Sequence, residues 1–226
     1  MDEREYSLEI TKEFLDEYVK FEKIKRETPE LFARFEEKYD DVFNMYRQTR
    51  NSLTHNRVGS NSSFPLIVSK YTLNGLKEKI RWMTTKAIDR CIKTQDIETV
   101  TIDTPIYDAI SLMNKKNYSY LPIFNKGKLE YIISEKSLIC ILADNEDGVL
   151  YDKTIKVSSF LSYFELNNNP NEYYEIISRE TLLYDLKEAF GIVKNDKKCG
   201  AIFITHSGKK EESVLGMITL WDVVNN

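Results

Sequence analysis

The stretch GAIFITHSGKKEESVLGMITLWDVVN, residues 200–225, decides the fold of the C-terminal half of the chain. Its two short apolar runs, GAIFIT and VLGMIT, are separated by a polar segment that contains a glycine, which predicts two strands joined by a turn. LWDVVN follows the second run directly and predicts a short helix. Thr219 ends the second strand and Asp222 comes three residues later, so both side chains face the same way at the start of that helix.

The same order of elements occurs earlier in the chain. ETVTID, TPIYDAISLMNKKN, YLPIF, LEYIIS and SEKSLICILADN follow one another from residue 98, and YEIIS and TLLYDLKEAFGIV precede the stretch above. Aligning Thr104–Asp108 with Thr181–Asp185 gives an internal repeat of strand, helix, strand, strand, helix. One sheet face of such a unit has no cover, so we expect the two repeats to pack sheet against sheet.

Up to about residue 93 the apolar residues follow a helical period instead. Three amphipathic helices are predicted, the first over 6–25, the second starting at Thr28-Pro29-Glu30 and the third over 73–93. A bundle this small leaves apolar surface over, which favours a homodimer. The predicted class is α+β: an α-helical domain over 1–90, then a tandem module over 91–226, with repeats at about 94–145 and 153–226.

Composition narrows the function classes. The 226 residues are 42% hydrophobic and 30% charged, and the formal net charge of −4 gives no global attraction to nucleic acid or anionic lipid. No apolar run is long enough to cross a membrane and the N-terminus is acidic, so we expect a cytoplasmic protein with no membrane partner. Three widely spaced cysteines and two histidines predict neither disulfides nor a metal site.

The repeat resembles a tandem pair of CBS domains, a family named after cystathionine beta-synthase. The resemblance rests on the Thr104-Pro105 turn, on SYLPIF at 119–124, and above all on GMITLWD at 216–222. The last segment is similar to the ribose-binding signature of that family: glycine, two apolar residues, Thr or Ser, two variable residues and Asp. The resemblance implies a regulatory module that binds an adenine nucleotide, AMP, ADP or ATP, with a cyclic dinucleotide or S-adenosylmethionine left open.

The signature also has a direct chemical interpretation. The Asp222 carboxylate can accept both hydroxyls of a ribose, and free backbone N–H groups at the start of a helix favour a nearby phosphate. The alternative is that Thr219 and Asp222 only form a capping box. The first repeat departs from the signature, with Glu130 where glycine is usual and Ser137 where the acid belongs. We therefore expect one nucleotide per chain.

The CBS resemblance implies further contacts for a nucleotide held by the second repeat. The base pocket would come from the first repeat, from the backbone around Ile97 and Glu98 and from Tyr118 and Ser119. Tyr118 could stack on a purine, although a tyrosine there is equally compatible with ordinary packing. Lys198, at the equivalent place in the second repeat, would reach the phosphate.

RNSLTH, residues 50–55, stands apart from the repeat. It resembles the Arg-x4-His motif of HEPN domains, helical dimers that include metal-independent ribonucleases. Arg50 is in register with the apolar stripe of its helix, where a cation needs an acid, a phosphate or a subunit interface. His55 lies about 140° around the helix from Arg50, so the two would meet only if the helix end unwinds or a second subunit contributes.

The HEPN resemblance implies roles in RNA cleavage by the 2′-hydroxyl. His55 would exchange the proton, Arg50 would stabilise charge on the phosphate, and Asn51 would orient one of these groups. Equally, His55 can be a helix cap and Arg50 a salt-bridge partner. Two hypotheses follow: a nucleotide-sensing protein that regulates a HEPN-type endoribonuclease, with RNA as substrate and coupling through the third helix, or a non-catalytic receptor whose helical domain dimerises or docks a partner.

Overall fold

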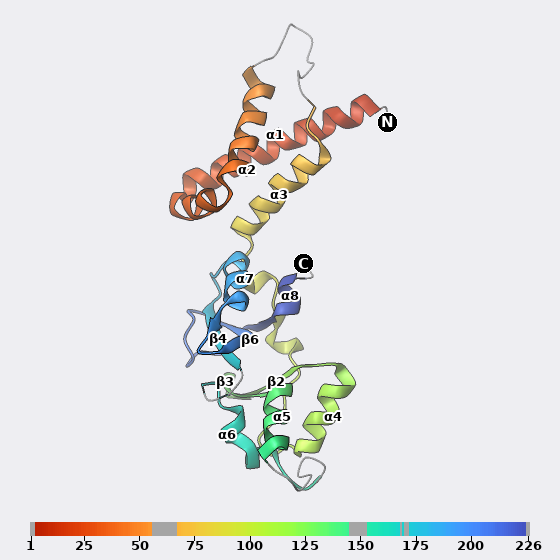
Figure 1. Cartoon of the computed structure of the whole chain (residues 1–226), viewed down its shortest axis with the longest axis vertical. Helices are drawn as coiled ribbons and strands as arrows, with labels where there is room; N and C mark the ends of the chain where they lie inside the picture. Colours follow the sequence, from red (N-terminus) through yellow and green to blue (C-terminus); the bar gives the residue numbers. More distant parts are fainter. Residues whose placement is uncertain (1–2, 56–66, 145–152, 168, 170–171, 225–226) are drawn as a thin grey trace. The chain divides into compact units, whose positions relative to one another are not determined.

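The computed structural model describes residues 3–55, 67–144, 153–167, 169 and 172–224 (Figure 1). The chain divides into two compact units, Met1–Thr85 and Lys86–Asn226. The first is helical and the second mixes helices with strands, which confirms the predicted α+β class. We refer to them as the helical unit and the repeat unit.

In the described part of the helical unit there are three helices: α1 (Glu3–Glu27), α2 (Pro29–His55) and α3 (Lys70–Thr84). Thr28 separates α1 from α2 because Pro29 cannot continue a preceding helix but suits the first turn of a new one. The core is aromatic: Phe21 lies 4.8 Å from Phe43 and 5.0 Å from Phe32, centroid to centroid, in edge-on geometry. Edge-to-face pairs of this kind add to the burial of the rings.

The third helix is shorter than predicted. It begins after Ser69, whose side chain caps the N–H of Thr72, and it ends at Thr84 rather than near Lys93. Residues 86–93 belong to the repeat unit instead. Ala87 N–H donates to the carbonyl of Thr181, and Ile92 and Lys93 pair with Met217 and Gly216. This pairing overrides the helical period of residues 85–93, so the single long helix proposed to couple the two halves does not exist.

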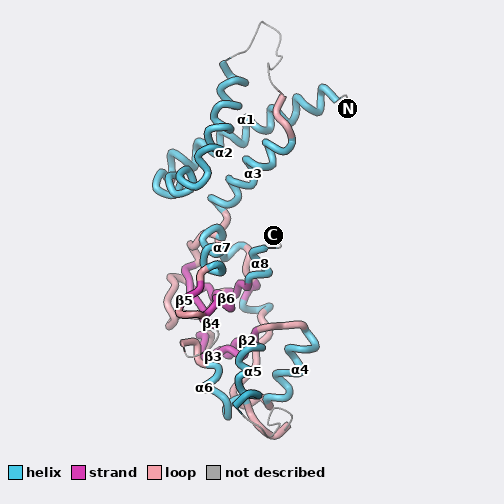
Figure 2. The backbone as a smooth tube through the Cα atoms, in the orientation of Figure 1, coloured by secondary structure: helices cyan, strands magenta, loops and turns pink. Residues whose placement is uncertain are grey.

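The repeat unit contains a five-stranded sheet in which the order is β1-β7-β6-β4 and β5 pairs with β6. Figure 2 shows strands in magenta, with β4, β5 and β6 of this sheet labelled. Strand β6 runs parallel to β4 and antiparallel to β7, as a strand–helix–strand–strand unit requires. Its elements are β1 (Ile92–Lys93), β4 (Glu172–Ser178), α7 (Leu183–Gly191), β5 (Val193–Lys194), β6 (Lys197–Thr205), β7 (Gly216–Thr219) and α8 (Leu220–Val224).

The first repeat forms a two-stranded sheet with helices beside it. Its elements are α4 (Ile106–Lys116), β2 (Tyr120–Asn125), β3 (Lys128–Ser134) and α5 (Glu135–Asp144), followed by α6 (Leu161–Phe164). Short 3-10 helices occur at Ala87–Asp89, Thr94–Asp96 and Val157–Phe160. The turn between β2 and β3 uses Lys126 and Gly127, both with positive φ.

The prediction of a strand at ETVTID, residues 98–103, is wrong. Residues 98–103 contain no strand, because their backbone is bonded elsewhere: Thr101 N–H donates to the Thr104 hydroxyl, and Ser158 N–H donates to the carbonyl of Ile102. Of the two apolar residues in the alternating pattern, Val100 is buried and Ile102 is 40% exposed, so the pattern does not correspond to a strand with one buried face.

The two sheets pack face to face, as expected from the repeat. The core between them combines Leu129 and Ile132 of β3 with Ala201 and Phe203 of β6 and Met217 of β7. Separate apolar clusters lie under the helices of each repeat. Each sheet is thus covered by helices on one face and by the other repeat on its second face.

Candidate functional site

The end of β7 brings Thr219 and Asp222 together at the start of α8. One carboxylate oxygen of Asp222, Oδ2, accepts hydrogen bonds from both the backbone N–H and the hydroxyl of Thr219, each at 2.8 Å. These are the bonds of the helix cap considered as the alternative to ribose binding. A cap and a ribose site are compatible, because an ionised carboxylate has two oxygens and about four lone-pair positions.

A cavity of about 770 Å³ lies between the two repeats at this point. Its wall is built from the starts of β2, β4 and β6, from α5, and from the junction of β7 with α8. The lining residues are Ile92, Asn117, Tyr118, Ser119, Tyr120, Lys136, Glu172, Lys198, Cys199, Gly200, Met217, Thr219, Leu220 and Trp221.

Four of the predicted site residues line this one cavity: Tyr118 and Ser119 from the first repeat and Lys198 and Thr219 from the second. Two sequence regions about 80 to 100 residues apart are thereby brought together, as packing of the two repeats requires.

The other three predicted residues are not in the lining. Ile97 is buried in the core between the sheets. Glu98 is exposed and forms an ion pair with Lys116 at 3.8 Å. Asp222 is held against Thr219, whose side chain is in the cavity wall. Their assignment to the site remains a prediction.

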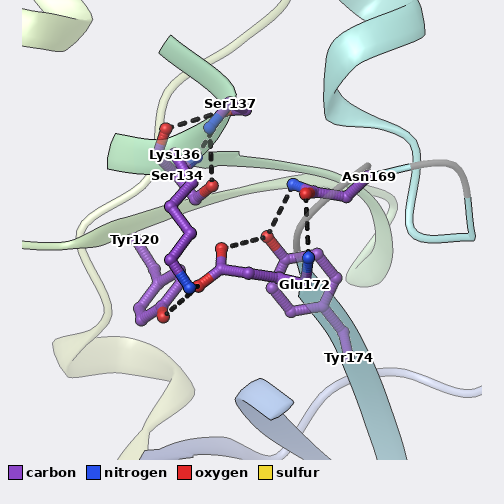
Figure 3. Close-up of polar contacts among 7 residues, drawn as sticks. All are labelled: Tyr120, Ser134, Lys136, Ser137, Asn169, Glu172 and Tyr174. Carbon is purple, nitrogen blue, oxygen red and sulfur yellow. Dashed lines mark hydrogen bonds and ion pairs between the residues drawn. The ribbon is translucent and has the colours of Figure 1, made fainter. Parts of the chain in front are cut away.

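Sequence reasoning missed the most highly bonded group in the wall, the carboxylate of Glu172 (Figure 3). Glu172 is 3% exposed. Its Oε1 accepts from the Tyr120 hydroxyl at 2.9 Å and lies 3.0 Å from the Lys136 ammonium, while Oε2 is 3.4 Å from the Tyr174 hydroxyl. Burial and the adjacent negative charge of Glu172 raise the pKa of Tyr120 above its usual range. No sequence motif links these residues, which come from three separate elements.

Gly200 makes room for this arrangement. A Cβ atom at Gly200 would lie 3.0 Å from the ring of Tyr174 and 3.2 Å from that of Tyr120. The two rings meet edge to face across the glycine, with centroids 6.3 Å apart. The glycine therefore allows both tyrosines to approach β6 and to present their hydroxyls to Glu172.

The helix start in the first repeat is closed by its own side chains. Ser134 and Ser137 exchange hydrogen bonds in both directions, from Ser134 N–H to Ser137 Oγ at 2.9 Å and from Ser137 N–H to Ser134 Oγ at 3.1 Å. Both are buried. Counting back from α5 and α8 also corrects the alignment: Tyr131, not Glu130, occupies the position of Gly216.

The thiol of Cys199, among the lining residues that the structure describes, is not an activated nucleophile. Burial raises the pKa of the Cys199 thiol to about 12, so the thiol is protonated at neutral pH. Within the described ranges, no group of three or more His, Cys, Asp or Glu side chains is arranged to hold a metal ion.

The RNSLTH residues lie at the end of α2. Arg50 falls between the buried residues Tyr46 and Leu53 on the apolar face, as the register predicts. Its guanidinium lies 5.8 Å from the centroid of the Tyr18 ring and donates to Asn51 Oδ1 at 3.1 Å. This aromatic contact is a partner that the sequence did not indicate. The His55 side chain lies outside the described residues.

One known family matches part of the repeat unit. The CBS domain family model matches residues 88–144. The matched residues include the first repeat of the repeat unit, which follows the helical unit in the sequence. No curated protein matches the sequence. Nor is any helix within the described ranges both long and apolar enough to cross a membrane.

The solved structures that match part of the chain are distant in sequence. CBSX2 in complex with AMP is 20% identical, with a TM-score of 0.43, and the match covers 62% of this chain and 94% of that chain. The CBS domain of a bacterial CNNM/CorC family Mg2+ transporter in complex with ATP is 14% identical, with a TM-score of 0.46 and coverage of 66% and 92%. A CBS domain-containing protein of unknown function from Bacillus anthracis str. Ames Ancestor is also 14% identical, with a TM-score of 0.46 and coverage of 65% and 95%.

Proposed function

We propose that the repeat unit binds one adenine nucleotide, AMP, ADP or ATP, as a regulatory ligand in the cavity between the repeats. The observation that carries this proposal is the convergence of Tyr118, Ser119, Lys198 and Thr219, each predicted from sequence, on a single cavity. Its volume of about 770 Å³ is within the usual range of small-molecule sites, roughly 300 to 1,000 Å³.

The residues of the cavity suit the parts of a nucleotide. Thr219 and Asp222 offer hydroxyl and carboxylate oxygens to the ribose, and the Tyr118 ring offers a flat apolar surface to the base. Lys198 supplies positive charge for the phosphate. The protonated thiol of Cys199 is a poor nucleophile, which favours binding rather than thiol chemistry in this cavity.

Asp222→Ala tests the proposal. Calorimetric titration of the full chain with AMP, ADP, ATP, cyclic di-AMP and S-adenosylmethionine should show one site per chain, and the variant should bind at least tenfold more weakly. Asp103→Ala is the matched control, since Asp103 is an exposed aspartate paired with Lys156 in the same unit. Absence of binding by the wild type, or unchanged affinity of the Asp222 variant, would contradict the proposal.

The helical unit has two candidate roles. The HEPN-type ribonuclease, a homodimer cleaving RNA under nucleotide control, draws support from the position of Arg50 on the apolar face of α2. The contacts of Arg50 with Tyr18 and Asn51 favour the second role, a non-catalytic receptor in which the helical unit dimerises or docks a partner, because they give the cation a structural function.

His55→Ala separates these roles. A ribonuclease should lose RNA cleavage in the variant while its circular dichroism spectrum stays the same, and cleavage by the wild type should change when AMP or ATP is added. A receptor should cleave no RNA in either form, and its oligomeric state, measured by sedimentation, should be the same in both.

A further inference from the structure

The cavity contains a second cation, Lys136, which comes from the first repeat. Its side chain is 46% exposed, and its ammonium lies 3.0 Å from Glu172 Oε1. Figure 3 shows the side chain extended along its whole length toward the carboxylate. An ammonium has three N–H donors, and Glu172 accounts for one of them.

The surroundings of Glu172 hold the ammonium in place. Besides its ion pair with Lys136, the carboxylate accepts a hydrogen bond from the Tyr120 hydroxyl at 2.9 Å. The backbone N–H of Glu172 donates to Asn169 Oδ1 at 3.1 Å. Asn169 in turn donates from Nδ2 to the Tyr174 hydroxyl at 3.3 Å. The acceptor of Lys136 is therefore fixed from several sides, while Lys136 itself reaches it from the exposed side.

Stability alone does not account for this pair. An ion pair with one partner half exposed contributes little, and a buried carboxylate is costly unless it is fully bonded. What the pair achieves is positional: it holds a flexible lysine at the cavity wall. A mobile lysine loses conformational entropy when it binds a ligand, and this loss weakens the binding. A lysine that is already held in place avoids most of the loss, so each contact with the ligand contributes more binding free energy.

Lys136 and Lys198 come from opposite repeats and line the same cavity, in which Glu172 is the one acidic lining residue among those described. Asp222, which is bonded to Thr219 in the wall, adds a second carboxylate, so the two lysines give the cavity no net positive charge. What favours an anionic group is the placement of the Lys136 ammonium at the wall, where its pairing with one oxygen of Glu172 leaves two of its three N–H donors for a ligand. A nucleoside has no such group, whereas a nucleotide does.

We propose that Lys136 is a phosphate-binding, specificity-determining residue of this cavity, and that Glu172 is the positioning residue that holds its ammonium. The inference rests on the proposed nucleotide site and adds to it the part of the ligand that the first repeat recognises. Thr219 and Asp222 read the ribose, and Lys136 with Lys198 reads the phosphate.

The test is a double variant, Lys136→Gln with Glu172→Gln, which removes both charges so that no buried carboxylate is left without its cation. The matched control is Lys156→Gln with Asp103→Asn, an exposed ion pair of 2.8 Å in the same unit. Adenosine, AMP and ATP are titrated into each full-length protein by calorimetry.

Loss of a charge-assisted hydrogen bond should weaken AMP and ATP by about tenfold or more, while adenosine should bind within about twofold of the wild type. The control should match the wild type for all three. Equal weakening of adenosine and AMP would mean that the pair only shapes the cavity, and an unchanged preference for AMP over adenosine would mean that Lys136 does not contact phosphate. Either result overturns the inference but leaves the nucleotide site intact, whereas a wild type that binds none of the three overturns both.

Discussion

Gly216→Ala should be among the most disruptive single changes in the repeat unit. A Cβ atom there would lie 2.3 Å from Cys91 Sγ and 2.8 Å from the carbonyl oxygen of Ile92. Ordinary contacts are about 1 Å longer, and the second atom belongs to the backbone of β1, which pairs with β7 at Ile92 and Lys93. The substitution must therefore move β1 away from β7 or distort both strands.

The expected magnitude follows from these contacts. Overpacking of a tight site costs typically 1–3 kcal/mol, and each lost hydrogen bond of the β1–β7 ladder adds roughly 1 kcal/mol. A total of about 3 kcal/mol would lower the urea midpoint of the repeat unit by roughly 1.5 M, for an m-value of about 2 kcal/mol/M. Hydrogen–deuterium exchange of β6 peptides at increasing urea measures this unit separately from the helical unit.

Gly191→Ala is the matched control. Gly191 is the last residue of α7, and a Cβ atom there would meet nothing within 4 Å. This change should be neutral or stabilise by up to about 1 kcal/mol, because alanine has the higher helix propensity. If Gly216→Ala unfolds at the same urea concentration as Gly191→Ala, the close approach of β1 to β7 is not what requires the glycine.

Three further predictions concern single side chains. Burial raises the pKa of Tyr46 from 10.0 to about 12, so between these pH values the folded helical unit keeps a proton that the unfolded chain releases. The stability of this unit, measured as its urea midpoint, should therefore fall as the pH rises from 10 to 12. The decrease should be smaller in the Tyr46→Phe variant. Hydrogen bonds from the hydroxyl and N–H of Ser207 lower the pKa of Glu212 from 4.5 to about 2. The contribution of the Glu212 carboxylate to stability is therefore present above pH 4.5 and lost as the pH falls through 2. An NMR titration of Glu212 should give a midpoint at about pH 2, and Ser207→Ala should raise that midpoint. Thr11→Val should destabilise the helical unit by about 1–3 kcal/mol in thermal unfolding, because the hydroxyl of Thr11 accepts the buried N–H of Val68 at 3.2 Å; an unchanged Tm would show that this N–H finds another acceptor.

The sequence alone was sufficient to predict those elements whose structure depends on their own local residues. The repeat, its helices and the strands at residues 120–134 and 197–219 follow from local period and turn residues, and sheet-on-sheet packing follows from their uncovered faces. It failed at 85–103, where a helical or strand-like apolar pattern is present but the backbone bonds to distant segments. A periodic pattern reports which side chains are buried, not which backbone groups pair.

The residues of the candidate site divide in the same way, into those that a local motif predicts and those that depend on distant contacts. Thr219 and Tyr118 were found because a motif fixes their distance from a helix start or a strand start. Glu172 belongs to no such motif: it is the first residue of β4, and its partners Tyr120 and Lys136 are 52 and 36 residues away in the sequence. Only the packing of the two repeats brings the three together, so a single sequence without structure contains no signal for them.

The two helix starts that face this cavity are related by the repeat, yet they have different side-chain chemistry. In the second repeat Thr219 is followed after three residues by the acid Asp222, whereas in the first Ser134 is followed by Ser137, and the two serines satisfy each other. The first helix start therefore offers no carboxylate to a ribose, but two residues after Ser134 it places Lys136 in the cavity wall. The loss of the acid in one repeat and the gain of a positioned lysine there are thus complementary, and together they argue for a cavity adapted to one nucleotide.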